Sequence, residues 1–430
     1  MQFNPRYPLL NPKLFHQQMP VPLKGAKAGH FNAALAEQLQ WSEADKQSWV
    51  EICSGQKTFA EFKPLAMVYA GHQFGQWAGQ LGDGRGLLIA QILDKNNQTI
   101  DLHLKGAGST PYSRMGDGRA VLRSVIREYL AGHALNSLGV ASSNAVGFTS
   151  SAQGVQREKL ELGAMMLRTS DCHIRLGHFE WINQYQPELL ADFVQKCIEW
   201  HYPECLDAEQ PILAFATKVI QRTAVMIAKW QLVGFAHGVM NTDNLNITGS
   251  TLDFGPYGFM ERFRPNWINN HSDYNARYTY QQQPSIGHWN LWTWLNNLIP
   301  LAPVENKQQF KEDLTQCLEH FEATFLEHYT LGLCQKMGLP SFHKDSFDCS
   351  MAFLRILQAE QLDYTDSFIR LQNKSYTALR DDCLDTRQFD TFLSQYQSIR
   401  ADQATDELDA EMFKVNPQYT LRNHMLQKAI

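Results

Sequence analysis

The residues best suited to metal-dependent phosphate chemistry lie close together in the second half of the chain. His237 to Asn244 reads H-G-V-M-N-T-D-N, and the triplet Asp253-Phe254-Gly255 follows shortly after it. Protein kinases carry H-R-D-L-x-x-x-N and then D-F-G, in which the asparagine and the second aspartate hold metal ions. Alignment on Asn244 retains both metal ligands but puts Val239 where a kinase has its base carboxylate. The pattern predicts a kinase-like metal site without the usual base.

Asn244 and Asp253 are predicted to face each other across a hairpin. Residues 244–247 and 250–253 can pair around a two-residue turn, Thr248-Gly249, which would put the two Cβ atoms roughly 5 Å apart. A carboxylate and an amide oxygen are ligands that suit Mg²⁺, whose remaining ligands are usually water and nucleotide phosphates. A polar turn without a ligand is the alternative, and a register change of one residue would separate the pair. The neighbouring Asp243 favours the metal site.

Two glycine-rich runs are candidates for phosphate binding. Gly79-x-x-Gly82-Asp83-Gly84-Arg85-Gly86 comes just before an apolar run predicted to be a strand, 87–93. Gly116-Asp117-Gly118-Arg119 leads into a predicted helix, 119–138. Glycine lets the backbone approach phosphate closely, and helix N-termini attract anions. Taken alone, the first run is better explained as a tight turn.

Lys105 and Glu128 are predicted to form an ion pair of the kind that orients phosphates. Residues 100–105 alternate apolar and polar side chains, so Lys105 belongs to the polar face of a half-buried strand. Glu128 falls on the apolar stripe of the helix 119–138 and should point inward. A strand lysine held by a helix glutamate is a feature of kinases. An unrelated surface ion pair is the alternative.

Arg168 and Arg175 flank a turn-like Thr169-Ser170-Asp171 in a predicted strand pair, where they could clamp phosphates. Arginines on a surface hairpin are the alternative.

The elements around these residues predict an α+β, protein-kinase-like fold with two lobes. Residues 1–60 are predicted to be an N-terminal arm with one helix near Asn32–Leu39, and 61–200 a β-rich N-lobe that holds the nucleotide-binding loops. Residues 155–180 look like strands. Residues 201–430 are expected to form a mainly helical C-lobe with the metal and catalytic loop. With 430 residues, 44% of them hydrophobic, the chain is long enough for two or three packed units.

Composition argues against several partners and compartments. The 38 basic and 44 acidic residues give a formal charge of −6, so no basic surplus favours nucleic acid. No apolar run approaches the roughly 20 residues that span a bilayer, which argues against a membrane partner. The eight cysteines form no C-x-x-C pair. These features, and an N-terminus without a targeting pattern, predict a cytoplasmic protein.

Longer strings carry a more specific signal. A-H-G-V-M-N-T-D-N-L-N-I, G-Q-L-G-D-G-R, L-K-G-A-G-x-T-P-Y-S-R and G-D-G-R-A-V-L-R-S resemble the selenoprotein O (SelO, YdiU) family, from F-N-P-R-Y-P-L-L near the start to N-P-Q-Y-T-L-R-N-H near the end. The resemblance implies a kinase-like fold that transfers AMP from ATP to Ser, Thr or Tyr hydroxyls of target proteins. UMP transfer from UTP, γ-phosphoryl transfer on the same fold, and a nucleotide-binding scaffold without chemistry are the alternatives.

The resemblance also implies roles for individual residues. Asp243 would accept the hydroxyl proton, and Asn244 with Asp253 would hold Mg²⁺ or Mn²⁺. Lys105 would contact the ATP phosphates and be braced by Glu128. The nucleotide site would be lined by Gly82, Gly84, Arg85, Asp117, Gly118, Arg168, Arg175 and Asp253.

Two features differ from the family pattern. Phe254 stands where the family usually has Tyr, a change that keeps the ring and should leave metal binding intact. The family usually continues beyond this C-terminus, where many animal members carry a selenocysteine. Residues 421–430 stop inside a predicted helix, so a truncated chain without that redox group is expected.

Overall fold

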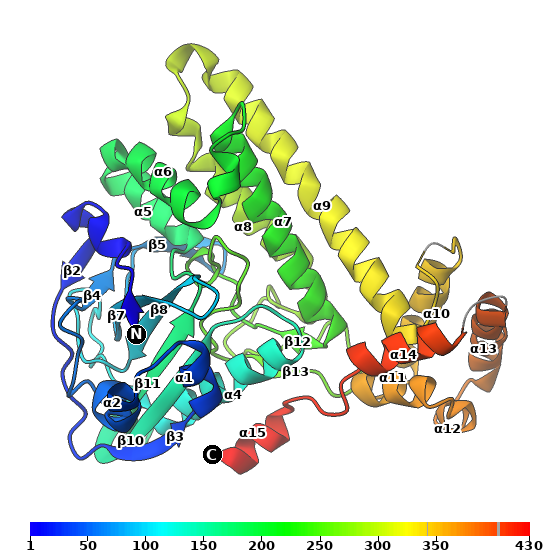
Figure 1. Cartoon of the computed structure of the whole chain (residues 1–430). Coiled ribbons are helices and arrows are strands. Elements are labelled where there is room, and N and C mark those ends of the chain that lie inside the picture. Colours follow the sequence, from blue (N-terminus) through cyan, green and yellow to red (C-terminus); the bar gives the residue numbers. More distant parts are fainter. Residues whose placement is uncertain (342, 402–404) are drawn as a thin grey trace.

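The first half of the chain is built around one antiparallel sheet of nine strands. The computed structural model describes residues 1–341, 343–401 and 405–430. The main path of the sheet is β2-β4-β7-β8-β11-β10-β3, with β1 paired to β7 and β9 paired to β11 (Figure 1). The strands are β1 (Gln2–Phe3), β2 (Phe15–Gln17), β3 (Lys27–Phe31), β4 (Leu65–Met67), β7 (Gly86–Leu93), β8 (Thr99–Lys105), β9 (Ala120–Val121), β10 (Asn144–Gln156) and β11 (Leu160–Ser170).

Residues 1–60, which were predicted to be an N-terminal arm, supply three strands to this sheet. β1, β2 and β3 pair with β7, β4 and β10 respectively. The expected helix is confirmed as α1 (Ala33–Gln38), capped by the side chain of Asn32, which accepts from the Leu35 amide. Two further short helices follow it, α2 (Glu43–Gln47) and α3 (Trp49–Cys53). Among the residues of these helices, Ala36 of α1 and Ile52 and Cys53 of α3 are buried in the core.

β8 is a strand as expected, but it is buried on both faces rather than one. Asp101, His103 and Lys105 on its polar face are each no more than 7% exposed. Each meets a polar partner: the Gln91 amide donates to Asp101 at 2.7 Å, and His103 lies 3.3 Å from Asp83. Burial of polar groups is tolerated when they are paired in this way.

The strands predicted between 155 and 180 end earlier than expected. β10 and β11 pair in a long antiparallel hairpin from 144 to 170, and α5 (Leu176–Tyr185) replaces the remainder. The helix predicted at 119–138 is α4 (Leu122–Ser137), which packs on β10 and β11. It starts later than expected because residues 120 and 121 pair with β11 as β9.

The second half of the chain is mainly helical. α7 (Pro211–Leu232), α8 (Gln283–Asn296) and α9 (Lys307–Met337) pack against one another and project above the sheet (Figure 1). The others are α6 (Leu190–His201), α10 (Ser346–Ala359), α11 (Tyr364–Gln372), α12 (Tyr376–Asp381), α13 (Thr386–Ala401), α14 (Thr405–Val415) and α15 (Asn423–Ala429). Two pairs of short strands lie outside the main sheet: β5 (Ala70–Gln73) with β6 (Gln76–Gln80), and β12 (Phe235–Ala236) with β13 (Gly258–Phe259).

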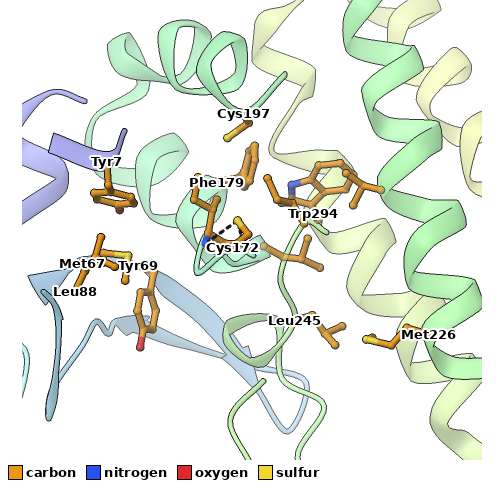
Figure 2. Close-up of a cluster of buried hydrophobic side chains, with 14 of the residues drawn as sticks. Tyr7, Met67, Tyr69, Leu88, Cys172, Phe179, Cys197, Met226, Leu245 and Trp294 are labelled. Carbon is orange, nitrogen blue, oxygen red and sulfur yellow. Dashed lines mark hydrogen bonds between the residues drawn. The ribbon is translucent and has the colours of Figure 1, made fainter. Parts of the chain in front are cut away.

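One continuous apolar core joins the sheet to α5, α6, α7 and α8, whereas α10–α14 pack in a second cluster. Figure 2 shows Met67 and Leu88 from the sheet in the same cluster as Phe179 of α5 and Trp294 of α8. The Phe179 and Trp294 rings meet edge to face, with centroids 5.5 Å apart. Among the described helices only α7 is long and apolar enough to cross a bilayer, and half of that stretch is buried inside the protein. The shared core therefore fixes the position of the sheet relative to α5 and α8.

Candidate active site

A cleft of about 510 Å³ between the sheet and the helices gathers the predicted site residues. It is lined by Gly82, Gly84, Arg85, Lys105, Asp117, Gly118, Arg168, Arg175, Asp243, Asn244 and Asp253. Glu128 does not line the cleft but lies directly behind Lys105. The volume is within the range of ligand pockets in proteins. Segments separated by more than 170 residues of sequence therefore meet in one place.

The predicted pair of Lys105 and Glu128 forms in the structure. Lys105 ends β8, and its Nζ donates to the carboxylate of Glu128 on the buried face of α4. Glu128 also receives Arg168 Nη1 at 3.3 Å. Burial lowers the pKa of Lys105, while the charge of Glu128 opposes that change. The lysine head group is thus held at the cleft wall by an acid that solvent does not reach.

Asp253 is gripped by two arginines. Arg168 Nη1 donates to one carboxylate oxygen at 2.7 Å, and Arg175 donates to the other through Nη2 at 2.7 Å and Nε at 3.2 Å. Burial would raise the pKa of Asp253, but the charges of Arg175 and Arg168 outweigh it and hold the pKa well below its usual range. Asp253 has a φ of +59°, a left-handed conformation that Asp adopts more readily than most residues. The side chain is therefore ionised and fixed in direction.

Asp243 lies in a short 3-10 turn, Thr242–Asn244, with its carboxylate facing the cleft. The Gln73 amide donates to Oδ2 at 3.1 Å, whereas Oδ1 has no hydrogen-bond partner among the described residues. A Cβ added at Gly71 would stand 2.6 Å from that Oδ1, so only glycine leaves it room. Burial raises the pKa of Asp243 to about 6. A carboxylate at the cleft wall with a pKa near neutrality is suited to general base catalysis.

The predicted hairpin between Asn244 and Asp253 is wrong in its register. Leu245 bridges Thr251, so Asn244 is not opposite Asp253. The intervening loop is longer than two residues because the Asn246 side chain closes it, accepting from the Ser250 amide at 3.0 Å. Gly249 takes the positive φ there, and Thr248 does not. Asn244 and Asp253 nevertheless line the same cleft.

Asn244 and Asp253 are the residues that could hold a divalent cation here, which would share the Asp253 carboxylate with the two arginines. The Asn244 Nδ2 donates to the Val239 carbonyl at 3.0 Å, which leaves its amide oxygen available as a ligand. Asp253 supplies an ionised carboxylate oxygen. No three His, Cys, Asp or Glu side chains gather into a metal site within residues 1–341, 343–401 and 405–430. A cation here would take its other ligands from phosphates and water, as Mg²⁺ commonly does.

The two glycine runs form the rim of the cleft. Gly82 has a φ of +143°, and a Cβ there would stand 2.6 Å from the Tyr112 ring. Gly118 packs so closely on the Gly108 carbonyl that a Cβ would overlap it. Asp117 is paired with Arg157 at 2.9 Å. The second run does not open a helix as predicted, because β9 separates it from α4.

Sequence reasoning did not predict several of the residues that line the cleft. Gln73 and Arg157 lie in segments with no recognisable pattern. Asp83 stands inside the first glycine run and is fully buried, accepting from the Met67 amide at 3.0 Å. Burial would raise the pKa of Asp83, but His103 and Arg175 lower it to about 2. An acidic residue within the G-D-G-R string was the sequence feature that could have indicated Asp83 as a site residue.

Comparison with known proteins shows the family of this chain. The sequence model of the family described as protein adenylyltransferase SelO matches residues 1–430. This chain belongs to that family. Two relatives named protein nucleotidyltransferase YdiU, from Vibrio parahaemolyticus and Vibrio cholerae, are 41% and 42% identical to it. The alignments cover 100% and 97% of this chain and 89% and 87% of the relatives.

A third YdiU relative, from Pectobacterium carotovorum, is 39% identical over 97% of this chain and 87% of its own length. As a member of the SelO family, the chain is a nucleotidyltransferase. The cleft described above is the place in the described structure where a nucleotide, a cation and a base could meet.

Proposed function

We propose that this protein transfers AMP from ATP to Ser, Thr or Tyr hydroxyls of target proteins, with release of pyrophosphate, on a kinase-like fold of two lobes. One observation carries the proposal: Lys105, Asp243 and Asp253 line a single cleft. The cleft thus combines a phosphate-binding cation, a candidate base and a candidate metal ligand. The family membership supports nucleotidyl transfer over other reactions of such a cleft.

In the proposed reaction the hydroxyl oxygen of the target forms a bond to the α-phosphorus of ATP. The bond between that phosphorus and the oxygen of the leaving pyrophosphate breaks. The hydroxyl proton passes to the carboxylate of Asp243, which lines the cleft. Asp243 replaces the base that a kinase carries at the position of Val239.

Charge stabilisation and positioning do most of the work in phosphoryl transfer. Lys105 holds the phosphates and is itself held by Glu128. Arg168 and Arg175 bring two further positive charges to the cleft wall, fixed by Asp253. A bound Mg²⁺ or Mn²⁺, held by Asn244 and Asp253, would supply further neutralisation of charge on the phosphates.

Separate incubations with α-labelled and γ-labelled ATP test the proposal. Label on protein from the α position alone, with an added mass of AMP by intact-protein mass spectrometry, is the expected result. Label from the γ position alone would instead establish kinase action, with Asp243 as the base. ATP-dependent thermal stabilisation without label from either nucleotide would indicate a nucleotide-binding scaffold without catalytic activity.

The same assay with UTP separates AMP transfer from UMP transfer, because the two adducts differ in mass. We further propose that the protein acts in the cytoplasm on protein targets, without nucleic acid or membrane partners. The formal charge of −6 and the buried apolar face of α7 support this placement.

A further inference from the structure

The hairpin β5–β6 forms the wall of the cleft beside Asp243 and has no role in nucleotide binding as proposed above. Besides the Gln73–Asp243 bond, the His72 amide donates to the Thr242 hydroxyl at 2.8 Å. The hairpin is thus attached at two points to the turn that holds the base. Gln73 at the end of β5 lines the cleft, and the exposed Phe74 follows it directly in the chain.

The tip of this hairpin is strained and presents an aromatic ring to solvent. Phe74 and Gly75 have φ values of +51° and +80°, as in a two-residue type I′ turn. A bulky residue in this region is a genuine outlier, and such outliers concentrate at functional sites. The Phe74 amide is held there by the hydroxyl of Tyr278 at 2.9 Å. Phe74 is 42% exposed, and Trp77 on β6 is 43% exposed.

A cation without an acidic partner lies against the same turn. The guanidinium of Arg277 stacks on Trp289, 4.6 Å from the ring centroid, and a Cβ at Gly75 would stand 3.0 Å from its Cζ. No carboxylate in the described part of the chain forms a salt bridge with Arg277. Its Nε and Nη2 are buried without hydrogen-bond partners there. A half-buried arginine of this kind favours an incoming negative group.

We propose that Phe74, Trp77 and Arg277 form the docking surface for the acceptor segment of the target protein, and that this segment carries a carboxylate close to the modified hydroxyl. The inference rests on the proposed AMP transfer and adds its acceptor specificity. Gly75, against which Arg277 packs, is two residues from Gln73. At about 3.3 Å per residue of extended chain, the carboxylate falls within about three residues of the hydroxyl.

Reversing the charge at residue 277 of the enzyme and beside the acceptor Ser of the peptide tests the proposal. The probes are short synthetic peptides with a single Ser, flanked by Glu or by Lys, incubated with α-labelled ATP. The wild-type protein should prefer the Glu peptide by up to about fivefold in kcat/KM, as a partly exposed ion pair supplies. Arg277→Glu should reverse that preference. Modification of the Lys peptide by this variant also shows that it is folded.

A matched control is Arg387→Glu, which reverses an equally cationic side chain on α13, a helix far from β5 and β8 (Figure 1). Its side chain is 92% exposed, and its peptide preference should equal that of the wild type. Trp77→Ala should raise KM for the Glu peptide with little change in the KM for ATP. AMP on both peptides at equal rates, or on the protein itself alone, would overturn the docking surface while AMP transfer stands. Absence of α-label from every acceptor would overturn the proposed function itself.

Discussion

The amide of Gln73 donates to one carboxylate oxygen of Asp243 and leaves the other without a partner in the described structure, although the two residues are 170 positions apart. The bond orients the carboxylate and favours its ionised form. Burial acts in the opposite direction and sets the pKa of Asp243 at about 6. Because a base must be ionised, this balance determines the pH at which the enzyme works.

The rate of AMP transfer should therefore rise with pH through about 6 and level off above it. In Gln73→Leu the carboxylate of Asp243 loses a hydrogen bond, so its pKa rises. The rising part of the pH–rate profile should then move to higher pH by roughly one unit. The measurement is kcat against pH with α-labelled ATP. Gln76→Leu alters an exposed residue of the same hairpin and should retain the wild-type profile. A pH–rate profile of Gln73→Leu that rises at the same pH as that of the wild type would show that Asp243 is not the titrating base.

Asp253→Asn should abolish AMP transfer and cost less stability than Asp253→Ala, since the amide oxygen can still accept from one of the two arginines. Asp253→Ala should lose activity and stability together. It leaves Arg168 and Arg175 buried with weaker partners, a change that typically costs about 3–5 kcal/mol. Label incorporation and thermal unfolding measure the two effects. Normal AMP labelling by Asp253→Ala would contradict the site.

Glu128→Ala should weaken ATP binding without removing any group that contacts the nucleotide. The variant frees the Lys105 head group, so KM for ATP should rise roughly tenfold or more. Lys105→Ala should be more severe, affecting kcat as well. Glu161→Ala is the matched control, because Glu161 also bonds an arginine, Arg123, but at the surface. Equal KM values for the Glu128 and Glu161 variants would remove Glu128 from the site.

Lys336 on α9 offers a test of stability rather than activity. It is buried, its Nζ donates to Asn416 at 2.9 Å and lies 4.4 Å from the centre of the Phe368 ring, and burial lowers its pKa to about 7. Between that pH and the ordinary value of 10.5 the unfolded chain binds a proton that the folded chain has lost. Stability should therefore rise with pH across this window.

Lys336→Met removes this contribution, so the variant should gain stability relative to the wild type at pH 6.5 and gain less at pH 9.5. The difference between the two gains should be at most about 3 kcal/mol. Urea unfolding at the two pH values measures it. Any cost of leaving Asn416 without its donor is the same at both pH values, so the change with pH isolates the titration. A gain that does not depend on pH would place the proton on Lys336 in the folded state.

Local patterns predicted the parts of the site that depend on a single element. Lys105 could be placed by strand alternation and Glu128 by helical periodicity, and each faces the direction that its period indicates. The relation of Asn244 to Asp253 was wrong because the loop between them is closed by a side chain, Asn246, instead of a two-residue turn. Turn chemistry of that kind is not visible in hydrophobic patterning.

Contacts between distant segments could not be predicted at all. Gln73 and Asp243 meet only because the hairpin β5–β6 packs beside α5 and the 3-10 turn of Asp243. Similarly, the sequence offered Arg168 and Arg175 as ligands for phosphate but gave no reason to pair them with Asp253. The sheet likewise takes its outer strands β2 and β3 from the first 31 residues, a segment with little alternation.

The ion pairs of Arg168 and Arg175 with Asp253 have a consequence for biosynthesis. Both arginines leave the ribosome 78 or more residues ahead of that carboxylate. During that interval each has only its more distant acid, Glu128 or Asp83, at 3.3 and 3.8 Å in the finished protein. A nascent chain that stops short of Asp253 therefore lacks the counter-charge that completes this wall, and a partly synthesised enzyme should not modify its neighbours.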